Sequence, residues 1–151
     1  MEKEKIVGNI DHVVIAVRDM GKAKEFFSDL LETEFVDLGA IEEYGWRSAM
    51  SPGGVELLSP TRPDSDLAKF LDRRGEGLYA LAFTVQDADK AKAKAEEKGI
   101  RVVGDTGEVK LKEDLPPIRE LWLHPKDNYG VYVMFTQGLP YHPWETEWYK
   151  P

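Results

Sequence analysis

A chain of 151 residues with a net charge of −8 and no cysteine excludes several classes of protein before any motif is considered. Its length suits one ordinary domain, and its 42% apolar and 32% charged residues are typical of a globular fold. The acidic balance argues against nucleic acid as a partner, and no apolar run is long enough to span a membrane. Without cysteine there are no disulfides, thiolate nucleophiles or zinc–thiolate sites, and we expect a cytoplasmic protein.

The first half of the sequence predicts the order β-α-β-β-β. Residues 12–17 (HVVIAV) are β-branched and apolar, which is typical of a buried strand. Asp19 is a good N-cap for a helix over residues 20–31, where apolar side chains recur at helical spacing. Three further strands are predicted over residues 33–43, 45–51 and 55–60.

The second half predicts the same order again. A short helix within residues 61–76, capped by Asp64 or Ser65, joins it to the first half. A strand over residues 78–85 precedes a helix that begins after Asp87 and ends at Gly99. The remaining strands are expected over residues 100–105, 118–125 and 130–137, with a charged hairpin or loop over 107–117.

This similarity indicates an internal repeat with a period of 68 residues, as from Asp19 to Asp87. We therefore expect a single domain over residues 1–151, made of two modules and the helix between them. Its parts are module one at about 9–60, the linker helix at about 61–76, module two at about 77–137 and an aromatic tail at 138–151. The tail is expected to pack on the body of the domain or on a second subunit.

Four stretches carry a resemblance to a known family: DHVVIAVRD, VELLSP, LAKFLDRRGEGLYALAFTVQD and LHPKDNYGVYVMF. They resemble the vicinal oxygen chelate superfamily, which includes glyoxalase I, bleomycin-resistance proteins, extradiol dioxygenases and methylmalonyl-CoA epimerase. The pattern is most similar to epimerase-like members. The resemblance implies an α+β fold of two tandem βαβββ modules, whose mixed sheet forms an open, barrel-like cup with helices outside. It also implies a homodimer.

In that family a divalent metal takes ligands from the first and last strands of each half, and it stabilises an enolate oxygen during proton transfer. The resemblance assigns those four positions to His12, Glu56, Ala80 and Met134. Ala80 has no donor atom, and the thioether of Met134 suits hard divalent ions poorly. We therefore expect no cofactor, with a weak divalent metal at an incomplete site of His12 and Glu56 as the most that the sequence allows.

Two interpretations of His12 stay open. It is either a hydrogen-bonded histidine on an inherited strand or a functional group, which contacts a ligand or acts as a general acid–base paired with Glu56 across the cup. Arg47 and Arg119 are candidates for holding a ligand anion, unless they face solvent. Tyr132, Met134 and Ala80 are expected to line the ligand site.

One other tyrosine is expected to be excluded from that site. Tyr79 precedes Ala80, and because neighbouring strand residues point to opposite faces, we expect it to face away from the cup.

Three functional hypotheses follow. The first is a family member with a degenerate metal site that binds a small organic molecule, with or without metal-independent isomerase or lyase activity. The second is a metal-dependent methylmalonyl-CoA epimerase or glyoxalase-type enzyme. The third is a bleomycin-resistance-type protein that binds a cationic drug, which the net charge of −8 would favour.

Overall fold

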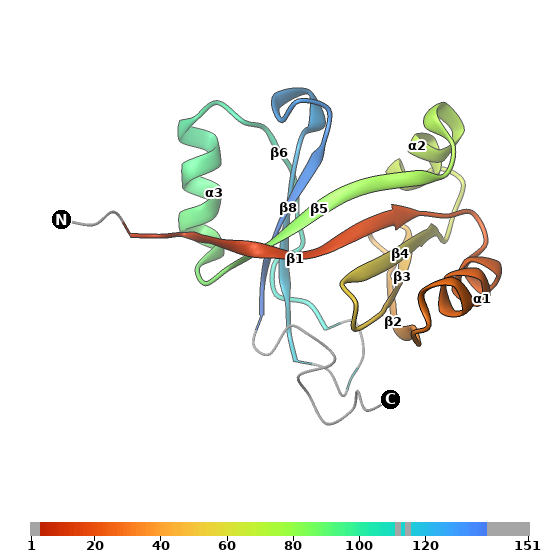
Figure 1. The fold of residues 1–151 in the computed structure, drawn as a ribbon. Helices are drawn as coiled ribbons and strands as arrows, with labels where there is room; N and C mark the ends of the chain where they lie inside the picture. The colour runs from red at the N-terminus through yellow and green to blue at the C-terminus, as the bar shows by residue number, and fades with distance from the viewer. Residues whose placement is uncertain (1–3, 111–112, 114–115, 139–151) are drawn as a thin grey trace.

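The computed structural model describes residues 4–110, 113 and 116–138, so the aromatic tail predicted from residue 139 onward lies outside the described residues. Its elements follow the order β-α-β-β-β twice, with one helix between the halves (Figure 1). The first half consists of β1 (Val7–Ala16), α1 (Met20–Leu31), β2 (Val36–Ile41), β3 (Trp46–Met50) and β4 (Val55–Pro60). The second contains β5 (Gly77–Val85), α3 (Ala88–Glu97), β6 (Val102–Asp105), β7 (Arg119–Leu123) and β8 (Tyr132–Gln137), with α2 (Asp66–Arg74) preceding it.

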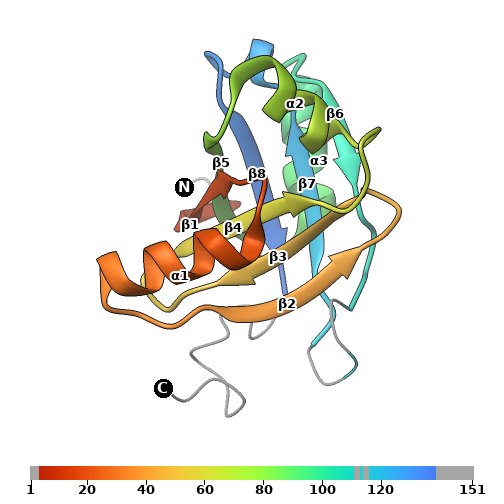
Figure 2. The same cartoon turned by 90° about the vertical axis from the view of Figure 1, so that its right-hand side faces the viewer.

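The described strands form one mixed sheet in the order β2-β3-β4-β1-β5-β8-β7-β6. The pairs β1–β4 and β5–β8 are parallel, and the two halves join where β1 runs antiparallel to β5. Figure 2 shows β2, β3 and β4 crossing the direction of β7 and β8, so the sheet is strongly curled. The prediction of two βαβββ modules around a cup-shaped sheet is therefore confirmed.

Local sequence signals determine where the helices begin. Asp19 accepts a hydrogen bond from the Lys22 backbone amide at 3.0 Å, and Asp87 accepts one from Lys90 at 3.1 Å. These bonds satisfy amides that a helix N-terminus leaves unpaired. Ser65, rather than Asp64, caps α2.

The two sides of the sheet are covered differently. The alanines of α3 pack against Val85 and Leu121 on the outer surface, near one end of the β1–β5 pair, and α1 lies near the other end (Figure 1). On the concave side, Leu67 and Leu71 of α2 join the main core cluster. Among the described residues, no helix is both long enough and apolar enough to cross a membrane.

Candidate functional site

The four positions that the family resemblance assigns to metal ligands lie on the four central strands, β4, β1, β5 and β8. Strand register arranges them in two neighbouring rows: His12–Ala82–Met134 and Glu56–Val14–Ala80. All six residues are buried. We call the concave face of the sheet that carries His12, Glu56, Ala80 and Met134 the inner surface.

His12 lies between two carboxylates. Its Nδ1 is 2.6 Å from Asp11 Oδ2, and its Nε2 is 2.7 Å from Glu56 Oε2. Ser48 donates to the other oxygen of Glu56 at 2.7 Å. A register shift between Ile10 and His12 marks a β-bulge, and this irregularity buries Asp11 beside the imidazole.

Burial and the two carboxylates act on the His12 pKa in opposite directions. Burial lowers the pKa, but hydrogen bonds to Asp11 and Glu56 outweigh that effect and raise it from 6.5 to about 9. The imidazole is therefore protonated at neutral pH, and its charge is compensated on both sides. Both interpretations of His12 stay open, because the hydrogen bonds of the first and the Glu56 contact of the second are both present.

Glu120 is a buried acid that the sequence analysis missed. It lies on β7, with 1% of its surface exposed, and its Oε2 has no hydrogen-bond partner among the described residues. Burial raises its pKa from 4.5 to about 8; repulsion from Glu56 adds to the rise, whereas His12 and a hydrogen bond from the Trp122 side chain oppose it. The carboxyl group is therefore mostly uncharged at neutral pH.

Thr136 lies directly opposite Glu120, on β8. It is 1% exposed, and its Oγ1 also lacks a partner within the described part of the chain. Two neighbouring buried polar groups with unused hydrogen-bonding capacity are uncommon in folded proteins. They mark this part of the inner surface as a place where a polar ligand atom or a water molecule would be bound.

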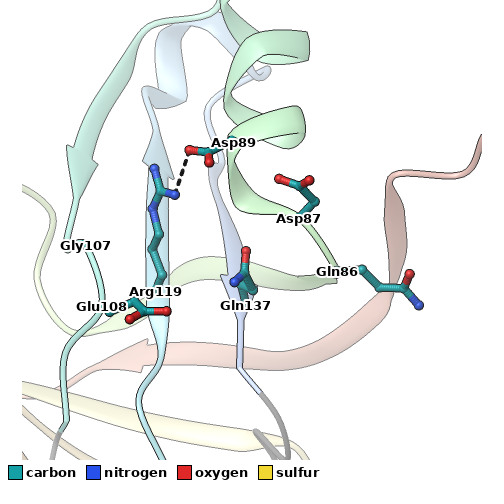
Figure 3. Close-up of a pocket in the computed structure, with 7 residues that line it drawn as sticks. All are labelled: Gln86, Asp87, Asp89, Gly107, Glu108, Arg119 and Gln137. Carbon is teal, nitrogen blue, oxygen red and sulfur yellow. Dashed lines mark hydrogen bonds and ion pairs between the residues drawn. The ribbon is translucent and has the colours of Figure 1, made fainter.

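The predicted ligand-binding arginines lie elsewhere. Arg119 donates to both oxygens of Asp105, at 3.0 and 2.8 Å, and to Asp89 at 2.8 Å. Figure 3 shows it beside Asp89 in a polar pocket of about 440 Å³ next to α3. This pairing holds the pKa of Asp105 well below its usual range. Since side chains alternate along β7, Arg119 faces α3 and its neighbour Glu120 faces the inner surface.

Arg47 is exposed and pairs with Asp37 at 3.6 Å. It lies between Trp46 and Ser48, which are both buried. The same alternation therefore turns Arg47 outward, and the structure brings neither arginine together with His12.

The orientation expected for Tyr79 is wrong. The partner of Val14 is Ala80 and that of Ile15 is Leu78, so Tyr79 is an extra residue in a β-bulge. Its ring packs in the main core cluster, 4.9 Å from Tyr132 between ring centroids. A cavity of about 60 Å³ lies among aromatic residues there, lined in part by Tyr44, Trp46, Tyr79, Trp122 and Tyr132.

A four-ligand divalent metal does not fit these residues. Ala80 and Met134 supply no oxygen or nitrogen donor, and His12 and Glu56 contact each other directly. Within residues 4–110, 113 and 116–138, no group of three or more His, Cys, Asp or Glu side chains could hold an ion.

Comparison with known proteins supports the family that the sequence resembles. The family model described as "Glyoxalase/Bleomycin resistance protein/Dioxygenase superfamily" matches residues 11–114, which is more than half of the chain. The protein belongs to this superfamily. The resemblance to epimerase-like members is likewise confirmed.

Three relatives illustrate that similarity. The mitochondrial methylmalonyl-CoA epimerase of Homo sapiens is 31% identical over 136 residues, which cover 87% of this chain and 75% of the relative. An ethylmalonyl-CoA/methylmalonyl-CoA epimerase of Cereibacter sphaeroides is 30% identical over 139 residues, covering 87% and 99%. A solved structure of a Streptomyces coelicolor methylmalonyl-CoA epimerase variant with 2-nitronate-propionyl-CoA has a TM-score of 0.74 and 32% identity, covering 87% and 97% of the two chains.

Proposed function

We propose that this superfamily member is an isomerase that epimerises a small acyl thioester of the methylmalonyl-CoA type by proton transfer, without a four-ligand metal. The observation that carries the proposal is the buried Asp11–His12–Glu56 arrangement on the inner surface. The similarity to acyl-CoA epimerases over 87% of the chain supports the substrate class.

Glu56 is the group best suited to remove the proton. One of its oxygens contacts His12 and the other accepts from Ser48, so the carboxylate is held in one orientation. The proton next to the thioester carbonyl would pass to Glu56, while the C–H bonding electrons move onto the carbonyl oxygen as an enolate. Transfer of a proton from solvent water to the opposite face of the planar carbon, as the electrons return from the enolate oxygen, and release of the proton from Glu56 to solvent would complete epimerisation and regenerate the base. A positioned base of this kind contributes about 10² to 10⁴ in rate.

Asp11 acts through His12. A carboxylate on Nδ1 fixes the orientation of the ring, so that Nε2 points at Glu56. Asp11 is thus a positioning residue in this proposal. The protonated His12 donates to Glu56 and so keeps that carboxylate charged and able to accept a proton.

A groove offers space for the rest of a thioester. It has a volume of about 1280 Å³ and is bordered by Asp11 and Thr136 among other residues. That volume exceeds the range of about 300–1,000 Å³ common for small-molecule sites. A ligand lying in the groove would have its reactive end near His12, because Asp11 contacts that ring.

The test is deuterium exchange. Methylmalonyl-CoA and a panel of other 2-substituted acyl thioesters are incubated with the protein in D₂O, with and without a chelator, and label at the 2-carbon is followed by mass spectrometry. We expect exchange that the chelator does not remove. Glu56→Gln should lower the rate by about 10²-fold or more, whereas Glu43→Gln, which changes an exposed acid, should leave it unchanged.

Exchange that is lost with the chelator and restored by one divalent ion would favour the metal-dependent alternative. The weak metal at His12 and Glu56 stays a prediction, which elemental analysis of the purified protein tests. A protein that binds thioesters yet exchanges no proton would instead be a binding protein, which the first hypothesis also allows.

A cytoplasmic homodimer belongs to the same proposal. α1 contains no buried residue, and its Phe26 and Leu30 are 59% and 60% exposed, although apolar side chains of that size usually find a partner surface. Analytical ultracentrifugation should give twice the monomer mass of 17.1 kDa. Leu30→Lys should weaken the dimer if α1 is part of the contact.

A further inference from the structure

We infer that Glu120 and Thr136 together form a hydrogen-bonding site for the oxyanion of the ligand, in the role that a metal plays elsewhere in the superfamily. This inference rests on the proposed function and identifies a site outside the four inherited ligand positions. The juxtaposition that carries it is a pair of buried, facing side chains whose polar atoms Oε2 and Oγ1 have no partner in the described residues.

An enolate oxygen on the inner surface needs hydrogen-bond donors. Both ring nitrogens of His12 already contact carboxylates. Arg47 and Arg119 are paired with aspartates on the outer surface. Glu120 and Thr136 are therefore the inner-surface groups near His12 whose hydrogen-bonding capacity is least committed.

The environment of Glu120 favours a donor. A carboxylate in this position would be buried and repelled by Glu56, and the described residues form no salt bridge with it. These effects outweigh the attraction of His12, so the neutral acid is the stable form. A neutral carboxyl group carries one O–H, and the Trp122 side chain already hydrogen-bonds to the carboxyl. Since Oε2 has no hydrogen-bond partner among the described residues, it can donate into the inner surface, and the Thr136 hydroxyl can donate beside it.

Glu120 and Thr136 lie where they could bind the carbonyl oxygen of a substrate whose proton Glu56 removes. Glu120 and Thr136 lie on β7 and β8, whereas His12 and Glu56 lie on β1 and β4, with β5 between the two pairs of strands. Thr136 borders the same groove as Asp11. A carbonyl group bound across β5 would have Glu56 on one side, for proton removal, and the donor pair on the other, where negative charge develops.

The experiment measures binding as well as turnover, so that the two proposals can fail separately. The probes are 2-nitronate-propionyl-CoA and the CoA-free anion propane-2-nitronate, both planar anions that imitate an enolate. Affinity is measured by calorimetry between pH 6 and pH 10 for the unaltered protein and for Glu120→Gln, an isosteric change that keeps an N–H donor and removes the titration. The titration of the probe affects the affinity of both proteins equally. It therefore cancels when the pH curve of Glu120→Gln is subtracted from that of the unaltered protein.

We expect the affinity of the unaltered protein, relative to Glu120→Gln, to fall about tenfold per pH unit above the pKa of Glu120. Thr136→Val should lose affinity and exchange rate by about tenfold or more, while Thr136→Ser keeps both, because only the hydroxyl matters. Near-UV circular dichroism and urea unfolding verify that each variant folds.

Three results would overturn the inference: parallel pH curves for the unaltered protein and Glu120→Gln, full function in Thr136→Val, or no binding of either anion by the unaltered protein. If the anions bind with the expected pH dependence while no thioester exchanges deuterium, the site stands and the proposed epimerase activity fails. If exchange occurs and both Glu120→Gln and Thr136→Val leave it unchanged, the proposed function stands and this inference fails.

Discussion

Raising the pH should destabilise the fold through His12. The pKa of this buried imidazole is about 9 in the folded protein, against 6.5 for an unperturbed histidine. Below pH 6.5 both the folded and the unfolded chain hold the proton, so the stabilisation is fully present. Between pH 6.5 and 9 the unfolded chain releases the proton while the folded chain keeps it, and stability falls as the pH rises.

The size of the effect follows from the shift. A shift from 6.5 to about 9, at about 1.4 kcal/mol per pKa unit, corresponds to a loss of about 3 to 4 kcal/mol by pH 10. Glu120 contributes with the same sign, because its pKa is also raised, from 4.5 to about 8, so its contribution is lost over a lower pH range. The free energy of unfolding should therefore decline from about pH 5 to pH 10.

The assay is urea unfolding at constant ionic strength, followed by tryptophan fluorescence in half-unit pH steps. Asp11→Asn is the matched variant, because it keeps the size of the side chain and removes one of the two charges beside His12. It should move the decline to lower pH, since the His12 pKa falls when a carboxylate partner is lost. A stability that is flat or rises between pH 6.5 and 9.5 would refute the reasoning, and so would a decline that Asp11→Asn leaves in place.

Three predictions concern the framework of the site. Asp87→Ala removes the N-cap of α3 and should lower the free energy of unfolding by about 1 kcal/mol, while Glu97→Ala at the exposed end of the same helix should have little effect. Leu58→Ala empties a fully buried position on β4 and should cost about 2–5 kcal/mol in urea unfolding, whereas Leu78→Ala, at a 62% exposed position, should not. Gly45→Ala adds a Cβ that would approach Ser65 Cβ to 2.8 Å at a φ of +70°. It should lower the melting temperature more than Gly99→Ala, where φ is +77° but no atom of the described residues lies within 4 Å of the added Cβ.

Much of the fold can be predicted because its signals are local. Helix α1 spans Met20–Leu31, the same residues that its N-cap and apolar spacing predict. Strand β4 likewise spans the predicted Val55–Pro60, since a glycine turn and a proline bound it. The repeat then predicts the second half from the first.

The site is harder to predict, because it depends on which face each side chain occupies. Arg119 and Glu120 are adjacent on one strand, so their side chains point to opposite faces of the sheet. An error of one residue in the predicted alternation would place each of them on the wrong face. Alternation counted back from the buried Trp122 would have placed Glu120 on the inner surface. The bulges at Asp11 and Tyr79 have no comparable sequence signal, since an extra residue interrupts the alternation without changing the composition of the strand.

The sequence by itself determined the doubled βαβββ order, the helix starts and the two donor residues among the four inherited positions. Those properties depend on residue type and on spacing along the chain. Tertiary structure alone decided that His12 is held between Asp11 and Glu56 and that Arg119 pairs outside the cup. It also decided that Glu120 and Thr136 face each other inside the cup, where Oε2 and Oγ1 have no partner in the described part of the chain. The physical reason is that burial and charge pairing arise between strands distant in the chain, where register and bulges set the direction of each side chain.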